Sequence, residues 1–230
     1  MLKDIKIVID LDNTLLDSHK LWESLGEDME KLGVSKELWK EARARESARI
    51  KEAEEKGDYL QLYSIENIID FLKEKLGSRF DFLFVFYHFL PRFAGLLNDS
   101  KEDCLFPDSK AFLEKHKKEI ILLSFGNGVV QLSKILTTRL NRYLDPDRIF
   151  ITKKEKWQFF SENWKADRGN FPPKFMIDDC PRNLRLIKEH NPSVITICIR
   201  RPEVYVDENI HRRSINFVVK SLTEVEEIVK

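Results

Sequence analysis

The spacing of the apolar residues along this chain changes near residue 100. A short apolar run at residues 5–9 leads directly into the acidic sequence D-L-D-N-T at residues 10–14. From about residue 18 to residue 97 the apolar residues recur every three or four positions, and no strand-type alternation occurs. We therefore predict one buried strand followed by a purely helical stretch.

The helical stretch has segments of different character. Apolar stripes at helical spacing occur twice, at Leu21, Trp22, Leu25, Met29 and Leu32 and at Ile65, Ile68, Ile69, Leu72 and Leu76. Residues 36–56 between them are mostly charged, which predicts a largely exposed helix. Residues 80–97 are rich in Phe and Leu but contain Asp81, His88, Pro91 and Arg92, so we predict a buried helix pair rather than a membrane span.

After residue 104 the pattern alternates between strands and helices. We predict strands at 119–123, 148–152, 174–177, 194–199 and 215–219, and helices at 107–117, at 129–143, after a capping-box sequence at 152–155, and after Ser221. This alternation predicts a parallel sheet with right-handed crossovers, that is, an α/β fold with a Rossmann-like core. The core would comprise residues 1–17 and 98–230, with residues 18–97 as an all-helical insertion.

Four polar features follow the predicted strands or begin the helices after them. They are the pair Asp10 and Asp12, Ser124, the lysines near residue 154, and the pair Asp178 and Asp179. Taken singly, each is also consistent with ordinary turn and cap chemistry. In a parallel sheet, however, all four lie at the same edge, where α/β proteins bind their ligands. We therefore predict a functional site at this edge.

Composition narrows the class of protein. The chain has 230 residues, 42% of them hydrophobic and 34% charged, with 39 basic and 39 acidic side chains. A net charge of zero gives no support for a nucleic-acid partner or a membrane-surface partner. Cys104, Cys180 and Cys198 have no C-x-x-C spacing and predict neither a disulfide framework nor a zinc site. Charged residues interrupt the N-terminal apolar run, so we expect no secretion signal and a cytoplasmic protein.

The order of these features resembles the haloacid dehalogenase superfamily, most closely its phosphatases. The matching elements are D-x-D-x-T at residues 10–14, a strand ending in Ser124, a lysine, and a strand ending in Asp178-Asp179. The resemblance implies Mg²⁺-dependent phosphoryl transfer, with Asp10 as the nucleophile that forms an aspartyl-phosphate. It also implies that residues 18–97 form a cap that closes over the active site and contacts the substrate.

The resemblance gives Asp12 the role of general acid for the leaving oxygen and then of base for the hydrolytic water. An ordinary Asp is ionised at neutral pH, so this role requires an environment that favours the protonated form. The dehalogenases of the superfamily lack this second Asp, so its presence favours phosphoryl transfer over carbon–halogen cleavage. Thr14 would secure the loop backbone or the Asp pair by hydrogen bonding.

The phosphate, by the same resemblance, would be bound by Ser124 and by backbone amides near Phe125, Gly126 and Asn127. The sequence S-F-G-N-G at residues 124–128 departs from the more usual Ser/Thr-Asn arrangement. A direct contact between Asn127 and the phosphate therefore stays open.

A lysine should neutralise the nucleophile and the phosphoryl oxygens. The sequence offers Lys153, Lys154 and Lys156. We favour Lys156, because it lies 23 positions before Asp179 (179 − 156) and is followed by two phenylalanines. Lys154, nearer the predicted helix start, is the second choice.

The metal would be held by Asp10, the backbone carbonyl of Asp12, and Asp179, with Asp178 as a further or outer acid. Asn183 would either support the water shell of the metal or cap the helix that begins at Pro181. Mg²⁺ is the implied ion, although the same oxygen ligands suit Mn²⁺.

The leading hypothesis is a Mg²⁺-dependent hydrolase of a small phosphorylated metabolite, acting as a monomer or homodimer without a nucleic-acid or membrane partner. A phosphotransferase or mutase with the same aspartyl-phosphate is the alternative. A non-catalytic phospho-receiver is less favoured, because receiver domains carry their paired acids early and their nucleophile on a later strand, the reverse of the order here.

Overall fold

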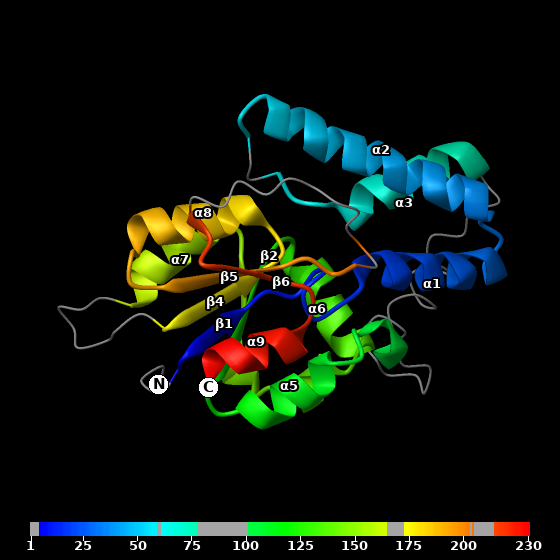
Figure 1. Cartoon of the computed structure of the whole chain (residues 1–230). Helices are drawn as coiled ribbons and strands as arrows, with labels where there is room; N and C mark the ends of the chain where they lie inside the picture. Colours follow the sequence, from blue (N-terminus) through cyan, green and yellow to red (C-terminus); the bar gives the residue numbers. More distant parts are fainter. Residues whose placement is uncertain (1–4, 59–60, 78–100, 165–172, 203, 205–213) are drawn as a thin grey trace.

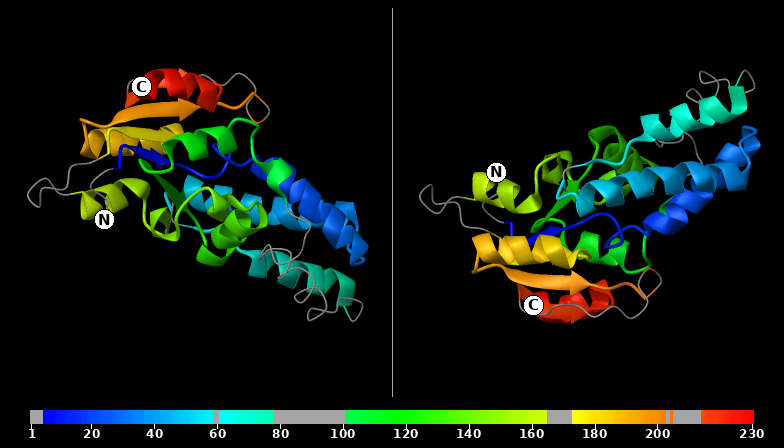
Figure 2. Two further views of the ribbon diagram at one scale, coloured as in Figure 1. Left: turned by 90° about the horizontal axis from the view of Figure 1, so that it is seen from below. Right: turned by 90° about the horizontal axis from the view of Figure 1, so that it is seen from above.

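The computed structural model describes residues 5–58, 61–77, 101–164, 173–202, 204 and 214–230. Within them the chain forms a sheet with helices on both faces and a group of helices beside it (Figures 1 and 2). The strands are β1 (Ile7–Ile9), β2 (Ile120–Phe125), β3 (Ile149–Thr152), β4 (Phe175–Asp178), β5 (Ile195–Ile199) and β6 (Phe217–Val219). The α-helices are α1 (Ser18–Lys31), α2 (Lys36–Glu55), α3 (Ile65–Leu76), α5 (Ser109–His116), α6 (Gly128–Thr137), α7 (Lys156–Asn163), α8 (Pro181–His190) and α9 (Leu222–Val229). Short 3₁₀ turns are η2 (Glu102–Cys104), η3 (Leu140–Arg142) and η4 (Pro146–Arg148).

The sheet has the strand order β3-β2-β1-β4-β5-β6, and its pairs are parallel. This confirms the predicted α/β fold. The first strand of the chain lies in the middle, because Ile9 pairs with Leu122 of β2 on one side and with Ile177 of β4 on the other. The residues after β1 therefore leave the sheet between the ends of β2 and β4.

Both faces of the sheet are covered, so alternate residues of β1 pack into two different layers. Ile7 and Ile9 join the cluster that contains apolar residues of α5, α6 and α9, whereas Val8 joins the cluster with α7 and α8. Figure 1 shows α5 and α9 on one side of the sheet and α7 and α8 on the other. Because β1 is buried on both faces, its position is fixed, and so is the start of the loop that follows it.

The helices α1, α2 and α3 follow β1 and extend away from the sheet (Figure 2). Their apolar side chains are continuous with the core, and the ring centroids of Trp22 and Trp39 are 6.2 Å apart. Gly26 lets Trp39 pack closely against the backbone of α1, since a Cβ at Gly26 would lie 2.7 Å from Cδ1 of Trp39. In α2 only Trp39, Ala42 and Glu46 are buried, as predicted for a largely exposed helix.

Two local predictions differ from the structure. The capping box at 152–155 is wrong, because α7 begins at Lys156 and the hydroxyl of Thr152 instead accepts a 3.0 Å bond from the backbone amide of Lys154. The helix predicted at 129–143 ends at Thr137, and Arg139 then takes the left-handed conformation with φ 57° before η3. The cap at Ser221 is confirmed, since its hydroxyl accepts a bond from the amide of Glu224 at 3.2 Å.

Two other predictions concern the helix pair at residues 80–97 and membrane-spanning helices. The helix pair predicted at residues 80–97 lies outside the described residues, so the boundaries of the helical insertion stay predictions. Among the helices that the structure describes, none has the length and apolar composition needed to cross a membrane.

Candidate active site

The loop after β1 is a tight turn that carries both predicted acids. The backbone amide of Asp10 still bonds to Ile177 of β4 at 2.9 Å, and the carbonyl of Leu11 then accepts bonds from the amides of Leu15 and Leu16 at 3.0 Å. Asn13 has φ 55°, a left-handed conformation that Asn tolerates better than most residues. The turn holds Asp10 at the central strand and directs Asp12 toward another element.

Lys156, the first residue of α7, lies inside the site. Its ammonium group contacts Oδ1 of Asp10 and is 2.6 Å from Oδ2 of Asp178, and only 3% of the lysine is exposed. Burial alone would lower the pKa of Lys156, but the charges of Asp10 and Asp178 raise it above the ordinary value. The side chain therefore stays charged.

The other two candidate lysines do not reach the acids. Lys153 and Lys154 are exposed, and Lys154 pairs with Glu162 at 2.6 Å. Of the three lysines that the sequence left open, geometry brings only Lys156 to Asp10.

Asp10, Asp178 and Asp179 form a compact cluster at the ends of β1 and β4. One carboxylate oxygen from each lies within 4.8 Å of the others. Burial raises the pKa of Asp10 well above its ordinary value, Lys156 opposes this rise, and the charges of Asp178 and Asp179 add to it. Such a set of carboxylate oxygens fits a hard divalent cation such as Mg²⁺, which prefers oxygen ligands.

Neighbouring groups hold the acids of β4 in place. Oδ1 of Asp178 accepts a bond from the amide of Cys180 at 2.8 Å, and the side-chain amide of Asn183 lies 3.4 Å from both Asp178 oxygens. Asp179 accepts a bond from Asn13 at 3.2 Å. Asn183 therefore contacts a carboxylate of the cluster and does not act as the side-chain cap of α8, whose N-cap is Cys180.

The surroundings of Asp12 differ from those that a general acid requires. Oδ1 accepts bonds from Lys134 at 2.7 Å and from Ser18, and Oδ2 accepts one from Gln131 at 2.8 Å. Burial raises the pKa of Asp12, but the charge of Lys134 and these hydrogen bonds outweigh it and lower the pKa below the ordinary value. The protonated form needed for the acid role is therefore disfavoured in this structure before substrate binds.

Ser124 is the penultimate residue of β2, near the same edge, and is 1% exposed. Its hydroxyl accepts a bond from the side-chain amide of Gln131 at 2.8 Å. Ser124 is thus linked through one side chain to Asp12, which accepts from the same nitrogen.

Two of the predicted phosphate-binding groups are engaged elsewhere. The amide of Gly126 donates to the carbonyl of Thr152 at 3.0 Å, because the loop continues the pairing of β2 with β3. The side chain of Asn127 caps α6 by accepting from the amides of Val129 and Val130 at 3.0 and 3.4 Å. The prediction for the Gly126 amide is therefore wrong in this structure, whereas those for the backbone amides of Phe125 and Asn127 stay predictions.

Thr14 supports the loop in a way that the sequence did not predict. Its buried hydroxyl makes no hydrogen bond with any described residue, so the predicted side-chain role is wrong. Instead its backbone carbonyl accepts two bonds from the guanidinium of Arg201, at 2.8 and 3.3 Å. Arg201 is 3% exposed, forms a bidentate pair with Asp108 at 2.8 Å, and lies over the ring of Phe106.

Sequence reasoning missed Gln131, Lys134 and Arg201. No local signal in the sequence identifies Gln131 or Lys134, because polar side chains on a short helix usually indicate a solvated face. Arg201 follows the apolar strand β5 at the same edge as the other site residues, which is the same signal that identified Ser124.

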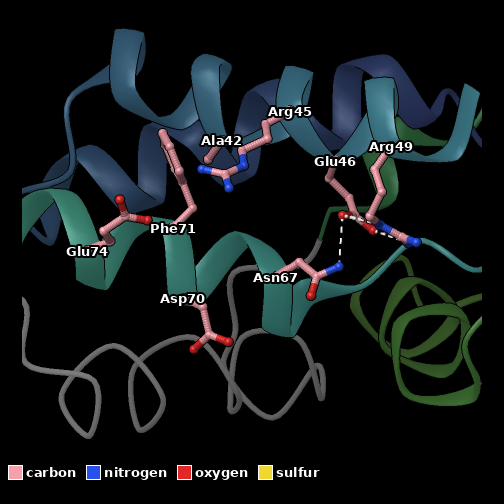
Figure 3. A pocket seen from close by; sticks show the side chains of 8 residues that line it. All are labelled: Ala42, Arg45, Glu46, Arg49, Asn67, Asp70, Phe71 and Glu74. Atoms are coloured by element: carbon pink, nitrogen blue, oxygen red, sulfur yellow. Dashed lines mark hydrogen bonds and ion pairs between the residues drawn. The ribbon is translucent and has the colours of Figure 1, made fainter. Parts of the chain in front are cut away.

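A separate hollow of about 400 Å³ lies between α2 and α3 (Figure 3). Arg45 lies over the ring of Phe71 at 5.1 Å, and Glu46 accepts bonds from Arg49 at 2.7 Å and from Asn67 at 3.0 Å. The residues that line it belong to the helical stretch expected to contact substrate, and none belongs to the carboxylate cluster.

Comparison with known proteins identifies the fold. The structure is similar to that of a haloacid dehalogenase-like hydrolase from Burkholderia xenovorans LB400, with a TM-score of 0.70 and 18% identity over 98% of this chain and 96% of that chain. The L-2-haloacid dehalogenase PA0810 matches with a TM-score of 0.63 and 14% identity over 98% of this chain and 99% of that chain. A magnesium-bound HAD-hydrolase from Bacillus subtilis matches with a TM-score of 0.61 and 14% identity over 99% of both chains. No protein-family model and no curated protein matches the sequence. The likeness is one of structure, and this chain has the fold of the haloacid dehalogenase-like hydrolases.

Proposed function

We propose that this protein is a Mg²⁺-dependent phosphomonoesterase of the haloacid dehalogenase superfamily that acts on a small phosphorylated metabolite. The observation that carries the proposal is the buried Lys156 between Asp10 and Asp178, with Asp179 completing a cluster of three acids. A carboxylate nucleophile and a phosphate monoester repel each other, so their reaction needs positive charge beside both. Lys156 supplies one such charge.

The chain's own groups account for the chemistry as follows. An oxygen of Asp10 attacks phosphorus, the bond from phosphorus to the leaving oxygen breaks, and an aspartyl-phosphate forms. The leaving oxygen takes a proton from Asp12. A water molecule then attacks phosphorus and gives a proton to Asp12, and cleavage of the bond between phosphorus and Asp10 restores the nucleophile.

The protonation of Asp12 is linked to substrate binding. Lys134, Ser18 and Gln131 favour the ionised carboxylate before substrate binds. A phosphoryl group bound at Ser124 adds negative charge nearby, which raises the pKa of Asp12 and opposes the effect of Lys134. The ionised form is in any case the one that accepts the proton of the hydrolytic water.

Asp10 and Asp179 would hold the divalent cation, with the carbonyl of Asp12 as a further ligand. Asp178 would be an outer acid of the site, since its oxygens already accept bonds from Lys156 and from the amide of Cys180. Bound there, the cation would shield the negative charge of the phosphoryl group from the carboxylate of Asp10. The similar hydrolase from Bacillus subtilis is bound to magnesium, which supports the choice of ion.

Cleavage of a carbon–halogen bond is the competing activity, because similar structures include haloacid dehalogenases. Two features favour phosphate esters. Attack on the carbon of a haloacid does not require a divalent cation beside the nucleophile, and such a reaction leaves a second acid at Asp12 without a leaving oxygen to protonate.

The test is a substrate panel assayed with purified protein. We expect phosphate release from small phosphomonoesters that requires Mg²⁺ or Mn²⁺, and a decrease of at least about a thousandfold in Asp10→Asn. L-2-Haloacids are assayed in parallel for halide release. Halide release without phosphate release would falsify the proposal.

Transfer to a second acceptor is distinguished from hydrolysis by adding candidate alcohols at saturating concentration. Phosphorylated acceptor as the main product would replace the hydrolase assignment with a phosphotransferase that uses the same nucleophile.

A further inference from the structure

Helix α6 delivers two buried polar side chains to the carboxylate of Asp12. Gln131 is 3% exposed and Lys134 is 8% exposed, and their distances to Asp12 are 2.8 and 2.7 Å. Residues three positions apart lie on the same face of a helix, so one face of α6 supplies both contacts. The partners are 119 and 122 positions from Asp12 in sequence.

The amide group of Gln131 joins two parts of the site. Its nitrogen donates to Asp12, to Ser124 at 2.8 Å, and to the carbonyl of Phe125 at 3.1 Å. The reversed amide would place its oxygen against the carboxylate, so the orientation is fixed by charge. Gly126 leaves space for the Gln131 side chain, because a Cβ at Gly126 would lie only 2.9 Å from Cγ of Gln131.

Lys134 gives the second acid of the loop its own cation. Asp10 is paired with Lys156 from α7, and Asp12 is paired with Lys134 from α6. With Gln131 on one oxygen and Lys134 on the other, the Asp12 carboxylate has donors at both ends and its rotation is restricted. The two acids therefore take separate positions although only one residue lies between them.

We propose that Lys134 and Gln131 are positioning residues that fix the Asp12 carboxylate beside Ser124, where it meets the leaving oxygen of a phosphate ester. This inference rests on the proposed phosphatase activity. Neither residue touches the nucleophile, so their removal should slow the proton transfer through Asp12 and leave the attack by Asp10 intact.

The choice of leaving group distinguishes an effect on proton transfer through Asp12 from an effect on the attack by Asp10. An alkyl phosphate needs a proton on its leaving oxygen, whereas 4-nitrophenyl phosphate does not. We expect Lys134→Met to lower kcat/KM, which reports the steps up to the aspartyl-phosphate, about tenfold or more with the alkyl ester and less than about threefold with the nitrophenyl ester. Lys134→Arg should recover most of the loss, and Gln131→Leu should repeat the pattern more weakly.

A double-mutant cycle links the effect to Asp12. In an Asp12→Asn background, Lys134→Met should cause no further loss of kcat/KM, because the group that it positions is already absent. An equal loss with both esters, or a full further loss in the Asp12→Asn background, would overturn the inference.

Lys101→Met is the matched control, because the Lys101 side chain is only 12% exposed and pairs at 3.3 Å with Asp28 of α1 rather than with Asp10 or Asp12. It should show no dependence on the leaving group. Thermal melting of Lys134→Met, Asp12→Asn and the double variant without substrate tests the pairing independently of activity. If the wild type cleaves no ester, the proposed function fails, and the positioning inference is then judged by melting: additive losses of Tm would overturn it as well.

Discussion

The ammonium group of Lys156 lies 2.6 Å from Oδ2 of Asp178, and the same group contacts Asp10, so a single buried cation bridges the two central strands β1 and β4. Such a group serves both the proposed chemistry and the stability of the sheet edge. Without it, the carboxylates of Asp10 and Asp178 would be buried with no positive partner from α7.

Lys156→Met tests this dependence. Removing one partner of a buried ion pair leaves uncompensated charge, so we expect a loss of roughly 3 to 5 kcal/mol in the free energy of unfolding together with a loss of activity. Denaturant unfolding and phosphate release are the measurements. Lys154→Met removes an exposed lysine two positions away and should cost less than about 1 kcal/mol. Similar losses for the two variants would contradict the assigned geometry.

Asp179→Asn tests the carboxylate cluster. In the wild type, Mg²⁺ should raise Tm, because a ligand that binds only the folded state stabilises it. The variant loses one of the three acids, so its Tm without the ion should not fall, and the increase on adding Mg²⁺ should largely disappear. Thermal scans over a series of Mg²⁺ concentrations provide the comparison, with Glu162→Gln as a surface-acid control. An unchanged response to Mg²⁺ in Asp179→Asn would exclude this residue as a ligand.

Arg201→Lys tests the support of the loop after β1, which carries Asp10 and Asp12. Lysine keeps the charge but cannot bond simultaneously to Thr14 and, in bidentate form, to Asp108. We expect a loss of about 2 to 3 kcal/mol in the free energy of unfolding and a reduced kcat, since a backbone carbonyl of the loop loses its donor. The exposed Arg185, paired with Glu189 at 3.7 Å, provides the control Arg185→Lys. Wild-type stability and kcat in Arg201→Lys would show that Arg201 does not support the site.

Glu46→Gln tests whether the stability of the packing between α2 and α3 depends on pH. Burial raises the pKa of Glu46, but hydrogen bonds from Arg49, Asn67 and the amide of Ser64 outweigh it and lower the pKa below the ordinary value. A lowered folded pKa means that the carboxylate stabilises the fold above its unfolded pKa of about 4.3 and that this contribution is lost as the pH falls through the folded value. The Tm difference between wild type and variant should therefore be constant near neutral pH and shrink in acid. Glu41→Gln, on the exposed face of α2, should show no such trend.

Much of the fold could be predicted because the required signals are local. The strands of the core are short apolar runs, each bounded by polar residues, and the alternation with helices determines a parallel sheet. The edge of that sheet then follows, and with it the meeting of Asp10 with Asp178 and Asp179. Spacing favours Lys156 among the three lysines, and the structure brings it to Asp10.

The surroundings of Asp12 could not be predicted in the same way. They depend on which face of α6 meets the loop after β1, a contact between segments more than 100 positions apart. A glutamine and a lysine on a helix usually indicate a solvated face, and nothing local distinguishes these two. The backbone roles of Gly126 and Thr14 were equally hidden, because hydrogen bonding of main-chain groups leaves little trace in side-chain identity.

The link between Arg201 and Thr14 also has a consequence for biosynthesis. The guanidinium of Arg201 lies 187 positions after Thr14 in the sequence, and its partner Asp108 additionally accepts a bond from the amide of Leu222. A growing chain emerges from the ribosome with its N-terminus first, so the loop at residues 10–16 is made before Arg201 and reaches its final form only after Arg201 has emerged. Nascent chains that end before Arg201 should therefore lack a firmly held Asp10 loop, however well their first strands have paired.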